Sequence, residues 1–189
     1  MVKQDVLRRY NLSQGNRFRK IFTCYRSPGL HAVVIFRFGH WLLGQPLPVK
    51  IFLKPLYVYL NHRMMAKWGI QIDVETRIGE GFLVFHYGGI FVGSEAVIGD
   101  NVSVSHNVTI GLAGEGRRRG APVIGNNVYI APGANVSGKI KVGNNARIGA
   151  NAVVSKDVPD NALVQVPHMQ VVVFPSLYGQ NNAAPGPGA

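Results

Sequence analysis

The chain has 189 residues, enough for one domain with an extension. Hydrophobic residues make up 47%, which excludes a disordered chain, and the single cysteine, Cys24, excludes a disulfide framework or a cysteine-rich zinc site. The formal net charge is +11, and residues 1–70 carry this whole excess, with 12 Lys/Arg against one acid. Unless these charges only solvate the surface, they favour an anionic partner.

Residues 1–68 are predicted to form a small basic helical domain. Ser27 and Pro28 have the chemistry of an N-cap and a first helical residue, and apolar residues follow at helical spacing from Leu30 to Leu42. A second apolar-periodic stretch runs from Val49 to Met64 and contains Pro55, a candidate kink.

Neither apolar stretch predicts a membrane span. The segment Leu30–Leu43 is shorter than the about 20 apolar residues that a span needs, and Arg37 and His40 interrupt it. No secretory signal is visible either, so we expect a cytoplasmic protein. Because basic apolar helices can lie on a lipid surface, residues 1–67 are a candidate for peripheral contact with the inner face of the membrane.

From Ile72 onward, an aliphatic residue recurs mainly every six positions. A period of six fits neither a helix nor a simple strand, but it fits a short strand followed by a turn, repeated around a triangular coil. We expect residues 69–175 to form a parallel β-helix of roughly four coils, and residues 176–189 to form a flexible tail. The repeating positions are Ile72, Ile78, Val84, Val92, Ile98, Val104, Ile110, Ile124, Ile130, Val136, Val142, Ile148 and Val154.

Two insertions interrupt this period. Two extra residues lie between Val84 and Val92, and eight lie between Ile110 and Ile124, in the loop 112–123. Loops inserted into a rigid repeat often carry function.

Two of the six histidines occupy equivalent places in the repeat. His86 and His106 stand third in their hexads, three sides apart, so we expect them on one side of the prism in adjacent coils. A neutral imidazole can take a proton from a hydroxyl, and a second imidazole beside it opposes double protonation. Three further histidines lie among the predicted helices, where a packed or interfacial histidine is expected: His31, His40 and His62.

Other chemistry is weaker in this sequence. Zinc binding by the two histidines is the main rival, but it lacks an obvious third ligand, for which Glu95 is only a weak candidate. Cys24 is far from both histidines in the sequence, so no nucleophile stands beside them.

Several segments resemble the hexapeptide acyltransferases, and within them the serine acetyltransferase-like branch. They are the repeat itself, Phe85–Gly93, Asn107–Gly111, Val153–Pro159 and the helical stretch His31–Leu42. The resemblance covers roughly residues 27–175 and implies a left-handed parallel β-helix that assembles as a trimer or a dimer of trimers. The hand of the helix comes from this resemblance alone.

The resemblance also implies a site. His86 falls on the catalytic base, which deprotonates an acceptor hydroxyl that attacks acetyl-CoA. The matched positions in the repeat, and not the resemblance, make His106 a neighbour that tunes or orients this base. Gly88 and Gly89 are candidate oxyanion donors. Acetyl-CoA, the co-substrate, would lie between neighbouring prisms against small residues, with Lys156 near its phosphates and Arg117–Arg119 as further candidates. The small residues, which otherwise simply fit tight corners, are Gly111, Ala131, Gly133, Gly149 and Ala150.

Three departures from the branch decide the predicted acceptor. Phe85 and Gln71 stand where the branch has aspartates, and Gly120–Ala121 stand where it has Arg-His. We therefore expect a saccharide hydroxyl as the acceptor, with the colanic-acid-type polysaccharide O-acetyltransferases as the most similar group. The alternatives are a serine O-acetyltransferase of cysteine biosynthesis, a non-enzymatic trimeric scaffold that docks on membranes, and a metal-dependent β-helix enzyme. Neither a resident metal nor a nucleic-acid partner is expected.

Overall fold

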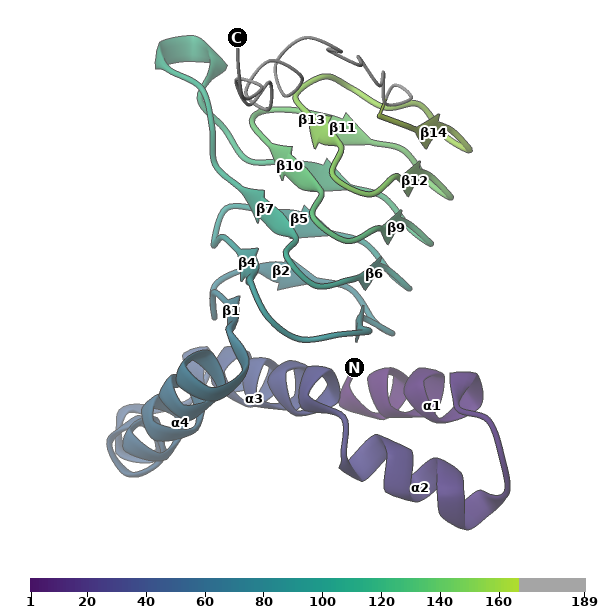
Figure 1. Ribbon diagram of the computed structural model, residues 1–189. Helices are drawn as coiled ribbons and strands as arrows, with labels where there is room; N and C mark the ends of the chain where they lie inside the picture. The colour runs from purple at the N-terminus through teal and green to yellow at the C-terminus, as the bar shows by residue number, and fades with distance from the viewer. Residues whose placement is uncertain (167–189) are drawn as a thin grey trace, which may run out of the picture.

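In the computed structural model, which describes residues 1–166, four helices precede a stack of short strands (Figure 1). The helices, α1 to α4, form what we call the helical base. Those that contact the strands are α1, α3 and α4. No helix in the described range is both long and apolar enough to cross a membrane. The helix bounds are Val2–Leu12, Arg17–Tyr25, Pro28–Leu43 and Leu47–Trp68.

Local signals explain where these helices begin and end. Helix α3 begins at Pro28 after the Ser27 hydroxyl, which accepts a 3.4 Å hydrogen bond from the Leu30 amide, as the sequence predicts. Helix α4 continues through Pro55 to a left-handed C-cap, Gly69. The periodicity of residues 1–26 is too weak to predict α1 and α2.

The strands form three parallel sheets, which make a β-helix of about five turns, here called the prism. Sheet A contains β1, β4, β7, β10 and β13; sheet B contains β2, β5, β8 and β11; sheet C contains β3, β6, β9, β12 and β14. The strands are Ile70–Ile72, Arg77–Ile78, Leu83–Val84, Ile90–Val92, Val97–Ile98, Ser103–Val104, Thr109–Gly111, Val123–Ile124, Tyr129–Ile130, Asn135–Ser137, Lys141–Val142, Arg147–Ile148, Val153–Val154 and Leu163–Val164, with a 3₁₀ turn at Gly116–Arg118.

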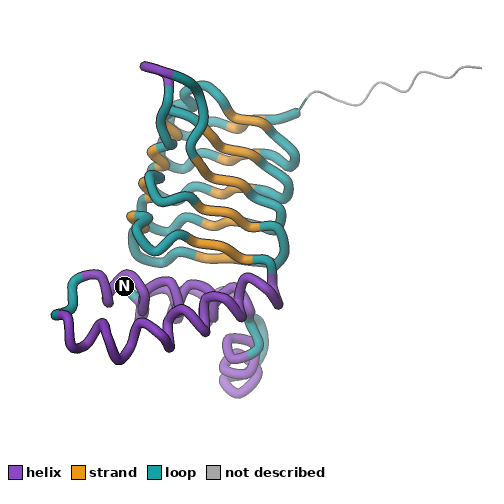
Figure 2. The backbone as a smooth tube through the Cα atoms, turned by 90° about the vertical axis from the view of Figure 1, so that its left-hand side faces the viewer, coloured by secondary structure: helices purple, strands orange, loops and turns teal. Residues whose placement is uncertain are grey.

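Figure 2 shows successive coils stacked above the helical base. The predicted fold class, a parallel β-helix preceded by helices, is confirmed. The expectation of roughly four coils falls short, because Val158 follows Val154 after only four residues and the strict period misses the last coil, which ends in β14. The predicted tail, residues 176–189, lies outside the described residues, and so does the end of the predicted 69–175 segment.

Inside the prism, one aliphatic side chain per strand packs into a continuous core. The corners turn through asparagines with positive φ, such as Asn127 and Asn145, at 57° and 58°. An asparagine adopts this conformation more readily than other non-glycine residues. The side chains also form a ladder, since Asn127 Nδ2 donates to Asn145 Oδ1 at 3.2 Å and Asn145 Nδ2 donates to Asn161 Oδ1 at 3.0 Å.

A buried ion pair attaches the helical base to the first coil. Arg37 Nε donates to Asp5 Oδ2 at 3.0 Å, and the two side chains are 4% and 0% exposed. Arg37 also donates to the Ile78 carbonyl at 2.6 Å, and Asp5 accepts from the Phe82 amide at 2.8 Å. Nearby, burial lowers the pKa of the Arg8 guanidinium, and the charge of Asp5 opposes that shift.

Candidate active site

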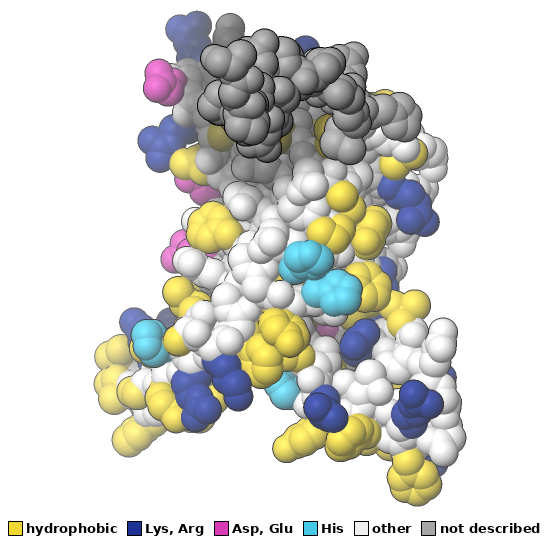
Figure 3. All heavy atoms as spheres, viewed as in Figure 1, with side chains coloured by type: hydrophobic (Ala, Val, Ile, Leu, Met, Phe, Trp, Pro, Cys, Tyr) yellow, Lys and Arg dark blue, Asp and Glu magenta, His cyan; other side chains and the backbone are white. Residues whose placement is uncertain are grey.

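The structure brings His86 and His106 together. Each stands two residues after a strand of sheet C, and the register pairs Val84 with Val104. Their ring centroids are 5.5 Å apart with planes at 81°. Figure 3 shows two histidine side chains in contact on the prism, above the helical base. We call this edge, where the chain leaves sheet C, the His corner.

The same corner carries four of the predicted small residues. Val104 pairs with Ile130 and Ile130 pairs with Ile148, so Ala150 continues the column of the histidines. Ala131 and Gly149 stand one residue before that column, and Gly133 stands one residue after it. The Gly133 amide donates to the His106 carbonyl at 3.1 Å, which ties this coil to the histidine below it. A ligand lying along the His corner would therefore pass all four.

Gly111 and Lys156 lie at a different edge. Gly111 ends β7 and Lys156 follows β13, so both stand where the chain leaves sheet A, on the side of the loop 112–123. A pocket of about 440 Å³ beside them is lined by Arg117, Lys139 and Ser155, among others. The structure thus separates the predicted nucleotide-phosphate residue from the imidazoles by the width of sheet A.

The outer face of sheet A lies between the His corner and the edge that carries Gly111 and Lys156. Asn135, which lies on this face, was not identified from the sequence. Phe91, Thr109, Asn135 and Val153 stack there in register. Asn135 Oδ1 is buried and has no hydrogen-bond donor among residues 1–166. A buried amide oxygen without a partner is a feature of sites that bind a ligand or water.

The chain bulges between β3 and β4, directly after His86. Gly88 and Gly89 adopt φ values of +101° and +64°, which the two inserted residues require. Tyr87 packs edge-on against Trp68 with centroids 4.7 Å apart, so α4 holds the bulge. The two glycines therefore lie next to the imidazole, as the predicted oxyanion donors must.

A pocket of about 350 Å³ that contains two arginines lies beside His86, between the prism and the helical base. Its walls come from α1, α2, the start of α3 and the bulge. Helix α3 can approach strand β3 closely because Gly29 has no Cβ, which would collide with the Val84 carbonyl oxygen. We call this pocket of about 350 Å³ the arginine pocket; its lining residues are Arg9, Phe22, Thr23, Arg26, Ser27, Pro28, Phe85, His86 and Tyr87. Sequence reasoning missed the two arginines, because the basic front signals charge but not which face it occupies.

The remaining candidates lie elsewhere. His40 Nδ1 is 2.8 Å from the Val74 carbonyl oxygen, as expected for a packed histidine. His31, which lies edge-on to the Tyr25 ring, and His62 are both exposed. Among residues 1–166, no group of three His, Cys, Asp or Glu side chains is placed to hold a metal ion.

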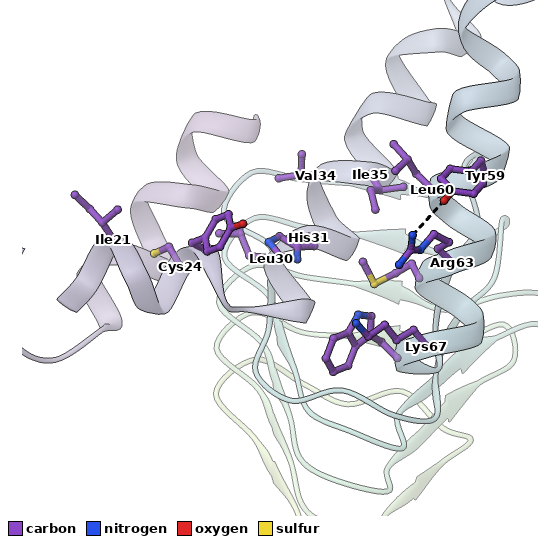
Figure 4. Close-up of a pocket in the computed structure, with 13 residues that line it drawn as sticks. Ile21, Cys24, Leu30, His31, Val34, Ile35, Tyr59, Leu60, Arg63 and Lys67 are labelled. Atoms are coloured by element: carbon purple, nitrogen blue, oxygen red, sulfur yellow. Dashed lines mark hydrogen bonds between the residues drawn. The ribbon is translucent and has the colours of Figure 1, made fainter. Parts of the chain in front are cut away.

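A larger hollow of about 630 Å³ lies between α2, α3 and α4 (Figure 4). It is mostly apolar and is bordered by Arg63, which donates to the Tyr59 hydroxyl at 3.1 Å. Buried Cys24 belongs to this wall. Neither His86 nor His106 lines it, so it is separate from the His corner.

The repeat and its histidine pair on a parallel β-helix define a hexapeptide-repeat transferase. Residues 121–156 match the bacterial transferase hexapeptide family (six repeats). Serine acetyltransferases of Synechococcus elongatus and Helicobacter pylori are 37% and 35% identical over 145 and 134 residues, which cover 77% and 70% of this chain and 56% and 74% of theirs. The chain belongs to the serine acetyltransferase family, although it spans little more than half of the Synechococcus relative.

Solved structures of serine acetyltransferases resemble the fold of this chain. The serine acetyltransferase of Neisseria gonorrhoeae in complex with serine is 34% identical with a TM-score of 0.71, over 88% of this chain and 66% of that one. The serine acetyltransferase of Brucella abortus in complex with coenzyme A is 32% identical with a TM-score of 0.71, over 88% and 64%.

These findings correct the predicted acceptor. The saccharide acceptor and the polysaccharide O-acetyltransferases as nearest group are wrong, because the similar proteins are serine acetyltransferases. The prediction weighed Phe85, Gln71 and Gly120–Ala121 more heavily than the match along the rest of the chain. Local departures change the walls of a site, but they do not remove the chain from its family.

Proposed function

We propose that this chain is an acetyl-CoA-dependent O-acetyltransferase that acts on the hydroxyl of L-serine. The observation that carries the proposal is the His86–His106 pair, whose ring centroids are 5.5 Å apart, with His86 lining the arginine pocket. Family membership supports the acceptor, since a related structure is described in complex with serine, and another in complex with coenzyme A supports the donor.

His86 is the general base in this proposal. Its exposed imidazole takes the hydroxyl proton as the serine oxygen attacks the thioester carbonyl carbon. The carbon–sulfur bond then breaks, and the CoA sulfur takes the proton from His86, so charge and protons balance. His106 orients the His86 ring, and the amides of Gly88 and Gly89 receive the negative charge that develops on the carbonyl oxygen.

The donor lies along the prism in this proposal. Ala131, Gly133, Gly149 and Ala150 leave room beside the His corner for the acetyl-bearing arm. Gly111 and Lys156 border the far edge of sheet A, where Lys156 meets the nucleotide phosphates.

A homotrimer supports this arrangement. Phe91 and Val153 expose apolar side chains on the outer face of sheet A, 40% and 74% exposed, where a neighbouring prism would cover them. Analytical ultracentrifugation should give three times the chain mass, and Val153→Lys should shift the distribution toward monomer. A monomeric wild-type chain would contradict the trimer.

The test of the function is an acetyl-transfer assay. The purified chain, acetyl-CoA and L-serine should release free thiol and form O-acetylserine, identified by its mass. His106→Ala should lower kcat and shift its pH profile, because it removes the neighbour of the base. Thiol release that does not depend on serine would overturn the proposal and favour a scaffold without catalysis.

Peripheral membrane contact by residues 1–67 has no support from the relatives. It stays a prediction that rests on the basic charge and on exposed rings such as Phe18 and Phe52, 82% and 80% exposed. Co-sedimentation with anionic vesicles tests it, with neutral vesicles as the control.

A further inference from the structure

The arginine pocket offers a positive charge to whatever His86 deprotonates. We propose that Arg9 and Arg26 bind an anionic group of the acceptor, and that this group, rather than an ammonium, positions the hydroxyl at His86. The ligand chemistry is a set of anionic oxygens: the carboxylate of serine or of a hydroxy acid, or a phosphate ester. The inference rests on the proposed function, because it places the acceptor next to that base.

Within residues 1–166, no acidic side chain competes for the two arginines. Among residues 1–166, the salt bridges join Arg37 to Asp5 and the N-terminal amine to Glu80, and neither involves Arg9 or Arg26. Their charges are therefore available to a ligand. A guanidinium is well suited to this task, because its planar fork matches the two oxygens of a carboxylate or phosphate.

Arg9 carries an unsatisfied donor. Its Nε is buried and finds no acceptor within the described range of 1–166. Leaving a buried N–H unpaired costs about 1–3 kcal/mol, so a buried donor of this kind is a place where a bound oxygen stabilises the protein. Arg9 lies on α1 and lines the same pocket as His86.

The Phe22 ring holds the Arg26 side chain at the arginine pocket. Arg26 is the C-cap of α2, its amide donates to the Phe22 carbonyl at 3.0 Å, and its guanidinium lies 5.3 Å from the centroid of the Phe22 ring. Such a cation–π contact orients the guanidinium without neutralising its charge.

The pocket also lacks the charge that an ammonium needs. None of its nine lining residues is Asp or Glu. The two positions where the resemblance leads us to expect aspartate carry Phe85, in the pocket wall, and Gln71, on the outer face of sheet A. An ammonium group therefore gains little here, while an anion is matched by two positive charges.

The first experiment compares acceptors with the wild-type chain. L-Serinamide keeps the hydroxyl and the ammonium but has no carboxylate, glycerate keeps the carboxylate without the ammonium, and glycerol 3-phosphate carries a phosphate instead. We expect kcat/KM for serinamide to fall about 10- to 100-fold below that for serine, the range for hydrogen bonds to charged groups. Glycerate should remain an acceptor, and the ratio of glycerate to glycerol 3-phosphate decides between carboxylate and phosphate. Equal values for serine and serinamide would overturn the inference.

The second experiment changes the arginines. Arg26→Gln should raise KM for serine and leave KM for serinamide unchanged, and Arg26→Lys should restore part of the difference. Arg17→Gln is the matched control, because Arg17 is exposed at the other end of the same helix and does not line the pocket. Arg9→Lys keeps the charge but removes the Nε donor, and its circular dichroism spectrum reports whether it folds. An Arg26→Gln variant with the wild-type ratio of serine to serinamide would contradict the assignment.

A binding measurement separates this inference from the proposed function. If no acceptor supports thiol release, the function fails, and the pocket is still tested by calorimetry with inorganic phosphate. Weaker phosphate binding in Arg26→Gln than in Arg17→Gln supports the anion site on its own. Equal binding in the two variants overturns it.

Discussion

The prism and the helical base are held together by different kinds of contact. Each coil of the prism repeats the same aliphatic packing and the same parallel register, so its stability is distributed over equivalent positions. The helical base instead depends on particular partners, above all the buried pair of Asp5 and Arg37, and leaves large side chains such as Phe18 and Phe52 exposed.

This difference explains where the candidate site lies. The repeat places His86 and His106 with great regularity, but a repeated surface offers few distinct polar groups. The helical base brings Arg9 and Arg26 to the first coil, and the bulge opens space between them and His86. The boundary between a regular part and an irregular part therefore brings together the imidazole that we propose as the base and the arginines that we propose as the anion site.

The largest effect on stability should come from the buried ion pair. Asp5→Ala leaves the Arg37 charge buried without its carboxylate, and we expect the free energy of unfolding to fall by about 3–5 kcal/mol in urea denaturation. The matched control is Glu80→Gln, which breaks the exposed contact with the N-terminal amine and should cost at most about 1 kcal/mol. Similar losses in both variants would show that the pair does not anchor the helical base.

A smaller effect is expected at the corners of the prism. Asn145→Ala places at φ = +58° a residue without the polar side chain that helps asparagine adopt this conformation, and it removes two rungs of the asparagine ladder. The left-handed conformation alone costs about 1–2 kcal/mol. Asn145→Gly should recover most of that cost, because glycine adopts positive φ freely. If the alanine variant is as stable as the glycine variant in thermal unfolding, the backbone argument is wrong.

The smallest effect tests whether the coils are equivalent. Ile→Val at Ile98, Ile130 and Ile148 removes one buried methyl group from successive coils, and each should cost about 0.5–1.5 kcal/mol. The repeat predicts that the three losses of unfolding free energy agree closely. Losses that differ from one coil to the next by more than this range would contradict a distributed core.

The period of the sequence predicts the prism because each hexad dictates one side of a coil. The same period places His86 and His106 at the same corner in adjacent coils, each two residues after a strand of sheet C. Their proximity therefore follows from the sequence alone. The pocket arginines do not follow from it. Their position depends on how α1 and α2 pack, and that packing rests on contacts between residues far apart in the chain, such as Asp5 with Arg37.

The acceptor shows a further limit of sequence reasoning. Phe85 and Gln71 indicate correctly that the local charges differ from those of the branch, but they do not identify the substrate. That two arginines lie beside His86 becomes visible only from the packing of the helices against the strands.

The measurement that tests the account most directly compares wild type with His86→Ala. Serine-dependent thiol release should fall by about 10²–10⁴-fold in the variant, while calorimetry with CoA gives the same affinity for both proteins, because His86 acts on the acceptor proton. Turnover close to that of the wild type would show that this imidazole does not remove the proton, and the mechanism would be wrong.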